Sequence, residues 1–307
     1  MIGCEKVNKY LYGLLVVITT SLMGSAFAIG KIGLAYASPI LLVSFRFIIA
    51  GVLMGIFVWF WKRPHPNNMK QWWHMFVIGS FQTAGVMGCI FVSLETITAG
   101  ESSILTFINP LLVVIFGTIF LKFSYRRLQW FGVILGFIGV FITFGAHVSI
   151  KIGTLLGFMS AVSWAIGTLL IKTWGAKIDV WVLTAYQMLF GGLILFIASF
   201  FLESPFFEVN MSSIFILLWL AIMASVVQFA IWFYLLHIGD PGKTSAFLFL
   251  APFFGVLSGW VLLQEPIEWY VILGGCFIFI GIFFSNWTPK NVYEKENMVK
   301  NTSKVGT

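Results

Sequence analysis

Charge is the scarcest property of this 307-residue chain: 9% of its residues are Asp, Glu, Lys or Arg, while 60% are hydrophobic. A soluble domain carries about 25% charged residues, so this chain has too few to cover a water-exposed surface, and its solvent must be lipid. A membrane-spanning helix needs roughly 20 mostly apolar residues, which leaves room for about ten helices with short loops. The apolar runs are continuous rather than alternating, which argues against a β-barrel.

Residues that carry hydrolytic, redox or metal chemistry are also few. The three cysteines, Cys4, Cys89 and Cys276, lie far apart without CxxC or metal-type spacing. The four histidines stand near the ends of apolar runs and none pairs at ligand spacing. No phosphate-binding loop or GxSxG motif occurs, and no loop is long enough for a nucleotide-binding domain. The sequence therefore predicts no metal, no cofactor and no enzyme.

Carboxylates are missing from the middle of every apolar run. Six stand at the ends of runs: Glu95, Glu101, Glu265 and Glu268 at outer ends, and Asp179 and Asp240 at inner ends. Proton-coupled pumps often use a carboxylate buried in the membrane. The chain thus lacks an obvious proton relay, and uniport or another form of coupling stays open.

Ten apolar runs follow one another, separated by segments rich in charge, Pro or Gly. They cover residues 11–30, 39–60, 72–93, 102–121, 129–146, 153–171, 181–201, 212–236, 245–263 and 269–287. If the N-terminus is inside and the sides alternate, 15 of the 18 Lys and Arg fall in inner segments. This bias is what the positive-inside rule expects, so the net charge of +7 sets orientation rather than nucleic-acid binding. We expect a multi-pass protein of the cytoplasmic membrane with both termini cytoplasmic.

The second half of the chain repeats the first. Pairs aligned at an offset of 141 or 142 are Lys31 with Lys172, Arg46 with Gln187, Gly51 with Gly192, Ser103 with Ser245, Phe107 with Phe249, Pro110 with Pro252, and Gly139 with Gly281. Because five spans per half is an odd number, the second half must enter the membrane from the opposite side, as in many secondary transporters. The predicted units are 11–146, 152–288 and a polar cytoplasmic tail at 289–307.

The start of the chain has a second interpretation. Lys6 and Lys9 precede an apolar run that ends in "SAFA" at Ala28, a pattern that also fits a secretory signal peptide. The repeat argues against that interpretation, because a matching segment occurs in the middle of the chain.

The duplicated segments "LMGSAFAIGK" and "SWAIGTLLIK", with "AGESSILTFINPLLVVIFG" and "PGKTSAFLFLAPFFGVLSGWVLLQEP", resemble the EamA-type transporters of the drug/metabolite transporter superfamily over about residues 11–288. The resemblance implies an all-α integral membrane protein with ten transmembrane helices as two inverted five-helix repeats. It also implies export of amino acids or related metabolites. Two positions depart from the family: Met23 replaces its usual tryptophan, and Phe123 replaces its usual glutamate.

Polar side chains in the middle of the runs are expected to face the protein interior, because exposure to lipid is costly. The candidates for a substrate cavity are Ser25, Arg46, Gln82, Ser103, Asn109, Trp164, Thr168, Gln228, Trp232 and Ser245. For Ser and Thr the alternative is a role in helix packing. Pro110 and Pro252 predict a matched pair of broken helices along the substrate path, or kinks that only shape the bundle.

Arg46 lies about eight residues, or roughly 12 Å, below the outer end of its run. At that depth we expect it to face inward as a structural anchor, or as a contact for a substrate or a gate. The remaining option is that it snorkels towards the outer headgroups.

The sequence thus predicts a secondary transporter that works by alternating access on a neutral or zwitterionic solute. The resemblance implies that the solute is an amino acid or a related metabolite and that it is exported. A heavily anionic solute would need several cavity cations, and only Arg46 is available. The expected partners are a small-molecule substrate and lipid. The glycine-rich fifth and tenth helices are predicted to pack closely, either to hold the two halves together or to join two protomers in a homodimer. The rival hypothesis is a non-transporting scaffold or a membrane-embedded enzyme. Against it stand the many polar residues within the runs and the lack of a cluster of His, Asp or Glu.

The predicted topology can be tested with reporter fusions. A reporter that is active only outside the cell should be silent when fused at Thr307 and active when inserted at Pro205, because these sites lie on opposite sides in the positive-inside arrangement. The reverse pattern would overturn the inverted-repeat hypothesis.

Overall fold

The computed structural model describes residues 9–123, 125–143, 151–238 and 247–286, and the fold of these residues is almost wholly helical. The first half contains α1 (Lys9–Gly33), α2 (Pro39–Phe60), α3 (Met69–Gly79), the π-helical η1 (Ser80–Gly85), α4 (Val86–Ser93), α5 (Ala99–Thr106), α6 (Asn109–Leu121) and α7 (Arg127–Thr143). The second contains α8 (Ile152–Trp174), the 3-10 turn η2 (Gly175–Lys177), α9 (Val180–Leu202), α10 (Met211–Ala221), the π-helical η3 (Ile222–Val227), α11 (Gln228–Ile238), the 3-10 turn η4 (Phe247–Phe249), α13 (Leu250–Leu263) and α14 (Trp269–Asn286).

The helices have the length and composition of membrane spans, which confirms the all-α membrane class. Seven helical segments are long and apolar enough to cross: Lys9–Gly33, Pro39–Phe60, Met69–Ser93, Ala99–Leu121, Ile152–Lys177, Val180–Leu202 and Met211–Leu236. Three shorter apolar helices, Arg127–Ile142, Leu250–Leu263 and Trp269–Phe284, lie at the predicted fifth, ninth and tenth spans. The protein is therefore multi-pass, and crossing by all ten segments stays a prediction.

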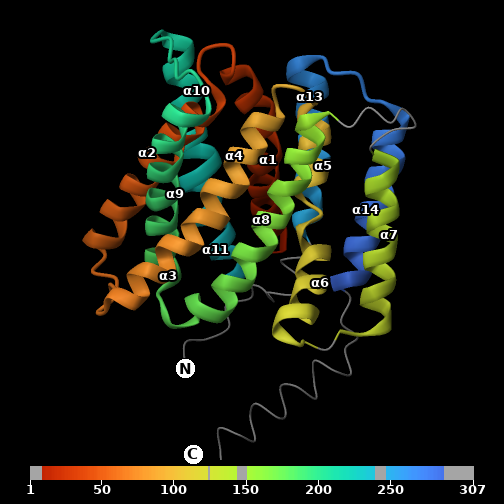
Figure 1. Cartoon of the computed structure of the whole chain (residues 1–307), viewed down its shortest axis with the longest axis horizontal. Helices are drawn as coiled ribbons and strands as arrows, with labels where there is room; N and C mark the ends of the chain where they lie inside the picture. Colours follow the sequence, from red (N-terminus) through yellow and green to blue (C-terminus); the bar gives the residue numbers. More distant parts are fainter. Residues whose placement is uncertain (1–8, 124, 144–150, 239–246, 287–307) are drawn as a thin grey trace, which may run out of the picture.

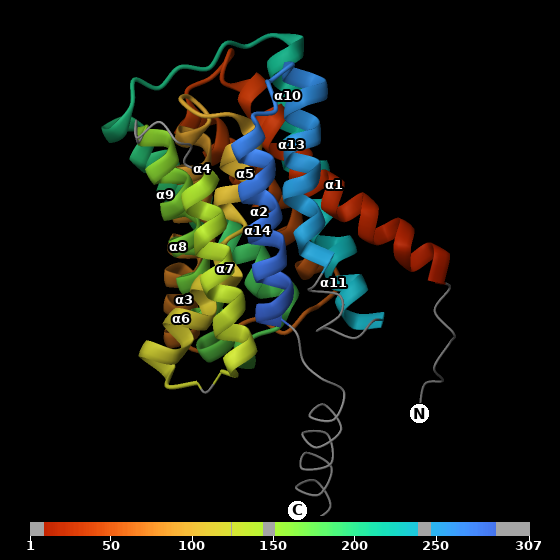
Figure 2. The same ribbon diagram turned by 90° about the vertical axis from the view of Figure 1, so that its right-hand side faces the viewer.

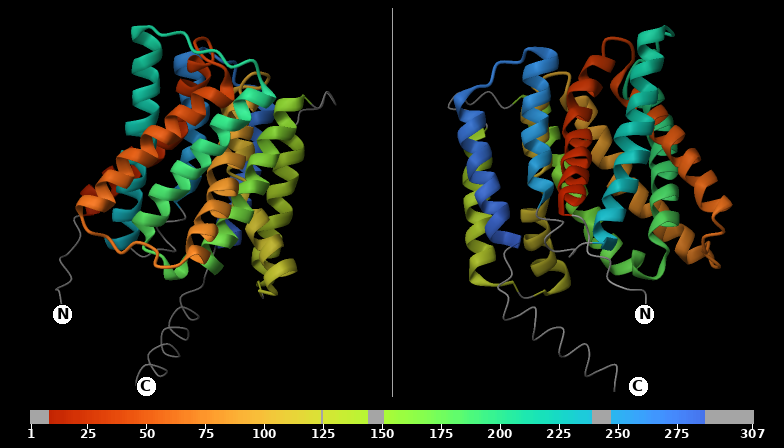
Figure 3. Two further views of the ribbon diagram at one scale, coloured as in Figure 1. Left: turned by 60° about the vertical axis from the view of Figure 1, so that its left-hand side comes forward. Right: turned by 180° about the vertical axis from the view of Figure 1, so that it is seen from behind.

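In Figure 1, α5, α7, α13 and α14 stand upright, whereas α2, α3, α4 and α8 cross the view at an angle. α2 and α9 lie towards one edge of the view, and α7 and α14 lie together at the other. Figure 3 shows the pair α7 and α14 from two further sides. In Figure 2, α1 leans away from the bundle towards its N-terminal end. α1 packs on α13 of the second half.

Two π-helical turns interrupt equivalent spans. Ser80–Gly85 lies in the third span and Ile222–Val227 in the eighth, at the repeat offset of 142. π-helical turns are rare and are frequent at functional sites, because they displace backbone groups from the regular helical ladder. The duplication therefore extends to irregular local geometry.

The contact between α2 and α9 is close enough to require glycine. A Cβ at Gly51 would lie 2.6 Å from the backbone nitrogen of Leu189, and one at Gly192 would lie 2.8 Å from the backbone nitrogen of Ile48. Membrane helices associate through such small residues because lipid provides no hydrophobic drive for their contact. These two glycines are repeat equivalents, so the same contact is made from both halves.

The glycine-rich helices α7 and α14 pack on one another within the chain. A Cβ at Gly139 would lie 2.5 Å from the carbonyl oxygen of Gly274, and one at Gly281 would lie 2.5 Å from that of Gly132. This surface joins the first half to the second. The dimer contact expected from the sequence stays a prediction, and these glycines are already used inside one chain.

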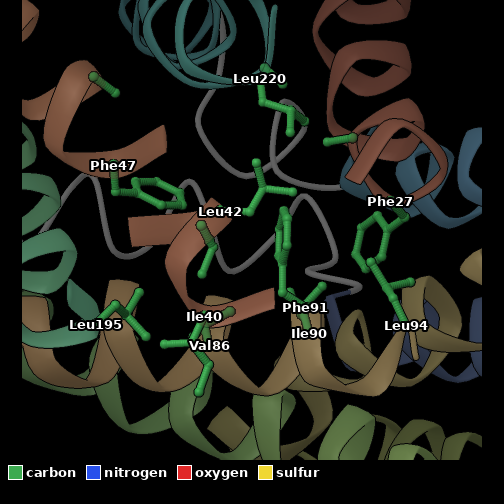
Figure 4. Close-up of a cluster of buried hydrophobic side chains, with 14 of the residues drawn as sticks. Phe27, Ile40, Leu42, Phe47, Val86, Ile90, Phe91, Leu94, Leu195 and Leu220 are labelled. Atoms are coloured by element: carbon green, nitrogen blue, oxygen red, sulfur yellow. The ribbon is translucent and has the colours of Figure 1, made fainter. Parts of the chain in front are cut away.

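Three clusters of buried apolar side chains fill the space between the helices, and the largest surrounds the site described below. Figure 4 shows part of that cluster, in which Phe27, Phe47 and Phe91 reach one region from α1, α2 and α4. Aromatic rings bury a large apolar area each, and here three helices contribute one ring apiece.

The packing of α2 on α9 provides a matched test of stability. Gly51→Ala should destabilise the protein by about 1–3 kcal/mol, because the added methyl meets backbone atoms that cannot move aside. Gly55 lies one turn further along the same helix, where an added Cβ would have nothing within 4 Å. Gly55→Ala should therefore be neutral or stabilising by up to about 1 kcal/mol. Thermal unfolding of the detergent-solubilised variants measures both, and equal melting temperatures would contradict the close contact.

Candidate functional site

A cavity of about 70 Å³ lies between the two halves. Its walls come from α1, α2, the third span and α5 of the first half, and from α8, α9 and the eighth span of the second. They are made by Met23, Ala26, Phe27, Arg46, Phe47, Gln82, Thr83, Val86, Met87, Ile90, Phe91, Thr106, Phe107, Trp164, Gln187, Met188, Ala224, Gln228 and Phe229. Most are apolar or aromatic, with few polar groups among them, the usual composition of a small-molecule site.

Arg46 is buried, with 4% of its surface exposed, and it reaches across to the second half. Its Nε donates to Ser225 Oγ at 3.0 Å and its Nη2 donates to the carbonyl oxygen of Ala224 at 2.9 Å, both within η3. The guanidinium carbon lies 4.8 Å from the centre of the Phe47 ring. A buried arginine needs such partners because desolvation of a charge is costly. Arg46 therefore lies inside the protein instead of extending to headgroups.

The guanidinium still has a donor to spare. No described residue accepts a hydrogen bond from its second terminal nitrogen, Nη1. The anchoring bonds hold the planar group in one orientation, and the free edge of the fork matches the geometry of a carboxylate. Arg46 thus joins two of the roles expected from the sequence, anchor and available contact.

Two glutamine oxygens in the cavity wall also have no partner. Gln82 Oε1 and Gln187 Oε1 are buried without a hydrogen bond in the described part of the chain. Leaving a buried polar atom unpaired costs roughly 1–3 kcal/mol. A solute with N–H or O–H groups would relieve that cost, because both side chains line the cavity.

Aromatic rings form the opposite wall. The rings of Phe107 and Trp164 meet edge-on, with centres 5.3 Å apart, and Phe27 lies 6.4 Å from Phe107. Hydroxyls join the halves beside them: Thr106 and Ser160 share a hydrogen bond of 2.7 Å. The cavity therefore offers one cation and two acceptors against an apolar surface.

The end of the bundle that is predicted to face outward is tied by contacts between the halves. Glu203 accepts hydrogen bonds from the backbone nitrogens of Ile40 and Leu41 at the start of α2. The Ser38 backbone nitrogen donates to the carbonyl oxygen of Phe206 at 3.1 Å. Partial burial and the nearby Glu203 carboxylate raise the pKa of Glu95 at this end. Carboxylates are thus concentrated here around a helix N-terminus, where the helix dipole favours negative charge.

Four of the ten candidate residues line the cavity: Arg46, Gln82, Trp164 and Gln228. They come from α2, η1, α8 and α11, which are far apart in the sequence. Thr19 of α1 donates to the carbonyl oxygen of Gln228 at 3.1 Å, which ties that residue to the first half.

Five other candidates lie outside the cavity wall. The hydroxyls of Ser25 and Thr168 donate to carbonyl oxygens of their own helices, at 2.7 and 2.8 Å. Ser103 is buried and packs against Gly255 of α13. Asn109 is the first residue of α6, and Trp232 is half-buried on α11. The tenth, Ser245, lies outside the described residues.

The first of the two matched prolines stands at an interruption of its helix. The α-helix stops at Thr106 and begins again at Asn109, one residue before Pro110, with Phe107 and Ile108 in the turn between them. Pro252 is the third residue of α13, directly after the 3-10 turn η4. Phe107, in the first interruption, lines the cavity, so that break does help to shape the site.

Gln187 is the principal cavity residue that the sequence-based candidates did not include. It is 5% exposed and lines the same cavity as Arg46. The sequence could have indicated Gln187 as a cavity residue, because it is the repeat equivalent of Arg46 and equivalent positions of inverted repeats meet at the central axis.

These features define a class: a multi-pass helical protein with duplicated halves and a buried cavity between them, the architecture of membrane transporters. Within that class, the sequence pattern of the EamA-like transporter family matches residues 11–145 and 151–287. The chain belongs to this family.

Relatives support the assignment. The chain is 29% identical to "Uncharacterized transporter YvbV" of Bacillus subtilis over 293 residues, which cover 93% of this chain and 95% of that protein. It is 28% identical to an "Uncharacterized transporter" of Archaeoglobus fulgidus, covering 89% and 96%. A solved crystal structure with 19% identity matches 89% of this chain and 96% of that chain with a TM-score of 0.64, which shows a shared fold.

The cavity predicts a pattern of chemical accessibility. In a variant without the native cysteines, single cysteines at Gln82, Trp164, Gln187 and Gln228 should react with a small water-soluble thiol reagent, because these positions line the cavity. Ser44 is fully buried within α2 and does not line the cavity, so a cysteine there is the control and should be protected. Protection at all four cavity positions would show that they only pack.

Proposed function

We propose that this protein is a secondary transporter of the cytoplasmic membrane that exports amino acids or related neutral or zwitterionic metabolites by alternating access. The observation that carries the proposal is the cavity between the halves, where one arginine and two unpaired amide oxygens face an apolar wall. The chain's membership of the EamA-like transporter family supports the same conclusion. The ten spans and the cytoplasmic position of both termini belong to this proposal.

The polar groups account for a zwitterion. A carboxylate would accept hydrogen bonds from Arg46 Nη1, which has no protein partner in the described part of the chain. An ammonium group would donate to Gln82 Oε1 or Gln187 Oε1. The remainder of the solute would contact Trp164, Phe107 and neighbouring methionines. The carboxylate and the ammonium group of the solute then each have a partner in the cavity wall, and one cation is enough for a solute without net charge.

The two halves supply the moving parts. Cavity residues come from both halves, and the repeat relates Arg46 on α2 to Gln187 on α9. Rocking of one half against the other would expose the same residues to each side of the membrane in turn.

The direct test is metabolite profiling of the medium. Cells that overexpress the protein should release more of one or a few amino-acid-like solutes than cells that lack it. An unchanged profile, in cells that contain normal amounts of folded protein, would favour the rival hypothesis of a scaffold or a membrane-embedded enzyme.

Variants then test the site with the released solute. Arg46→Gln and Arg46→Lys should lower its transport at least about tenfold, because a hydrogen bond to a charged group contributes about 1.5–3 kcal/mol and each 1.4 kcal/mol is a factor of ten. Gln187→Leu should also lower transport without removing an anchoring bond. Ser25→Ala, outside the cavity wall, is the control. Normal transport by both Arg46 variants would contradict the proposed contact, whereas loss of folded protein in both would show an anchor alone.

A further inference from the structure

The turns that follow α6 and α13 have the same backbone conformation and occupy equivalent positions in the two halves. Lys122 and Gln264, which are 142 residues apart, both have left-handed backbone conformations, with φ of 54° and 52°. The next residues are Phe123 and Glu265, and each donates its backbone N–H to the carbonyl oxygen of the glycine six residues earlier, at 3.0 and 3.2 Å. The fold therefore places Phe123 and Glu265 equivalently, each at the end of its own half.

At one end this turn presents a carboxylate to a lysine of the other half. Lys31 Nζ lies 2.8 Å from Glu265 Oε1 and donates to the carbonyl oxygen of Ile97 at 2.7 Å. Glu265 also accepts the backbone N–H of Ala99, the first residue of α5, at 2.9 Å. The side chains are 28% and 12% exposed, so water screens this pair less than it screens a surface pair. We call Lys31 and Glu265 the outer latch.

At the other end the equivalent lysine meets a ring. Lys172 Nζ lies 4.2 Å from the centre of the Phe123 ring, again across the two halves. We call Lys172 and Phe123 the inner latch. A cation and an aromatic ring attract one another, but more weakly than a partly buried ion pair that also caps a helix. The repeat equivalent of Ala99 is Pro241, which lies outside the described residues and whose nitrogen carries no hydrogen to donate.

We propose that these two pairs are the end latches of the transport cycle, and that the replacement of a carboxylate by Phe123 biases the resting protein towards opening at the inner side. The proposal rests on the proposed function, since it assumes that the ends open in turn. The outer latch must break before the outer end opens, which separates an ion pair and removes the acceptor of the Ala99 backbone N–H. The inner latch separates without breaking an ion pair.

Labelling from each side of the membrane tests the bias without any substrate. Met87 lines the cavity and belongs to neither latch, so Met87→Cys in a background without the native cysteines is the reporter. A membrane-impermeant maleimide is added to intact cells or to inside-out vesicles. The reporter should react faster from the inner side. Glu265→Gln should raise outer labelling at least about fivefold, the lower end of a typical coupling between two states.

The reciprocal variant gives the sharper result. Phe123→Glu supplies Lys172 with a carboxylate, so inner labelling should fall at least about fivefold. Adding Lys172→Gln should restore inner labelling, because the charge pair is gone while the new carboxylate remains. Glu95→Gln, at the outer end but outside the latch, is the control and should change neither rate.

The outcomes separate the two proposals. If Phe123→Glu accumulates as folded protein and inner labelling is unchanged, the latch proposal fails, whether or not Glu265→Gln folds. If labelling responds to neither latch while the cells still export solute, transport stands and the latches do not. If the reporter reacts from neither side in any variant, alternating access itself fails.

Discussion

The contact of α2 with α9 is the constraint on which the site depends. Gly51 and Gly192 allow these helices to touch backbone to backbone, and no larger residue fits without displacing the opposite chain. Five residues before each glycine stand Arg46 and Gln187. The contact therefore holds both polar side chains at the boundary of the halves, where Arg46 is anchored on η3. Lipid offers no hydrogen-bond acceptors to a guanidinium group. Arg46 therefore needs the acceptors of η3, and η3 can supply them only when the two halves are packed together.

Because the chain is duplicated, each feature of the first half has an equivalent in the second, and some equivalent residues make different contacts. Arg46 is satisfied by the π-helical turn of the opposite half, whereas its equivalent Gln187 keeps an unpaired oxygen. Lys31 has a carboxylate partner, whereas its equivalent Lys172 has a ring. At these equivalent positions the two halves therefore differ in charge and in hydrogen-bond partners.

Much of the fold follows from the pattern of the sequence. The predicted runs 39–60 and 181–201 correspond to Pro39–Phe60 and Val180–Leu202, because an apolar run bounded by charge or proline has one stable form in lipid. Pro110 stands where its helix begins again after the turn at Phe107 and Ile108. The π-helical turns carried no comparable signal. Their residues are compatible with regular α-helix, and only packing against the opposite half selects the irregular form.

The sequence by itself determined that the chain is an all-helical membrane protein of two similar halves, since hydrophobicity, lysine and arginine placement and a repeat offset are local or additive properties. It also singled out Arg46, Gln82, Trp164 and Gln228, because large polar groups in apolar runs need interior partners. Only the tertiary structure decided that Ser103 packs against Gly255, that Gln187 lines the same cavity as Arg46, and that Phe123 faces Lys172. Those pairings depend on how each helix is rotated and which helix lies beside it. The rotation of each helix about its axis, and the choice of the helix beside it, depend on how surfaces from distant parts of the chain fit together. The hydrophobic pattern of one segment does not contain that information.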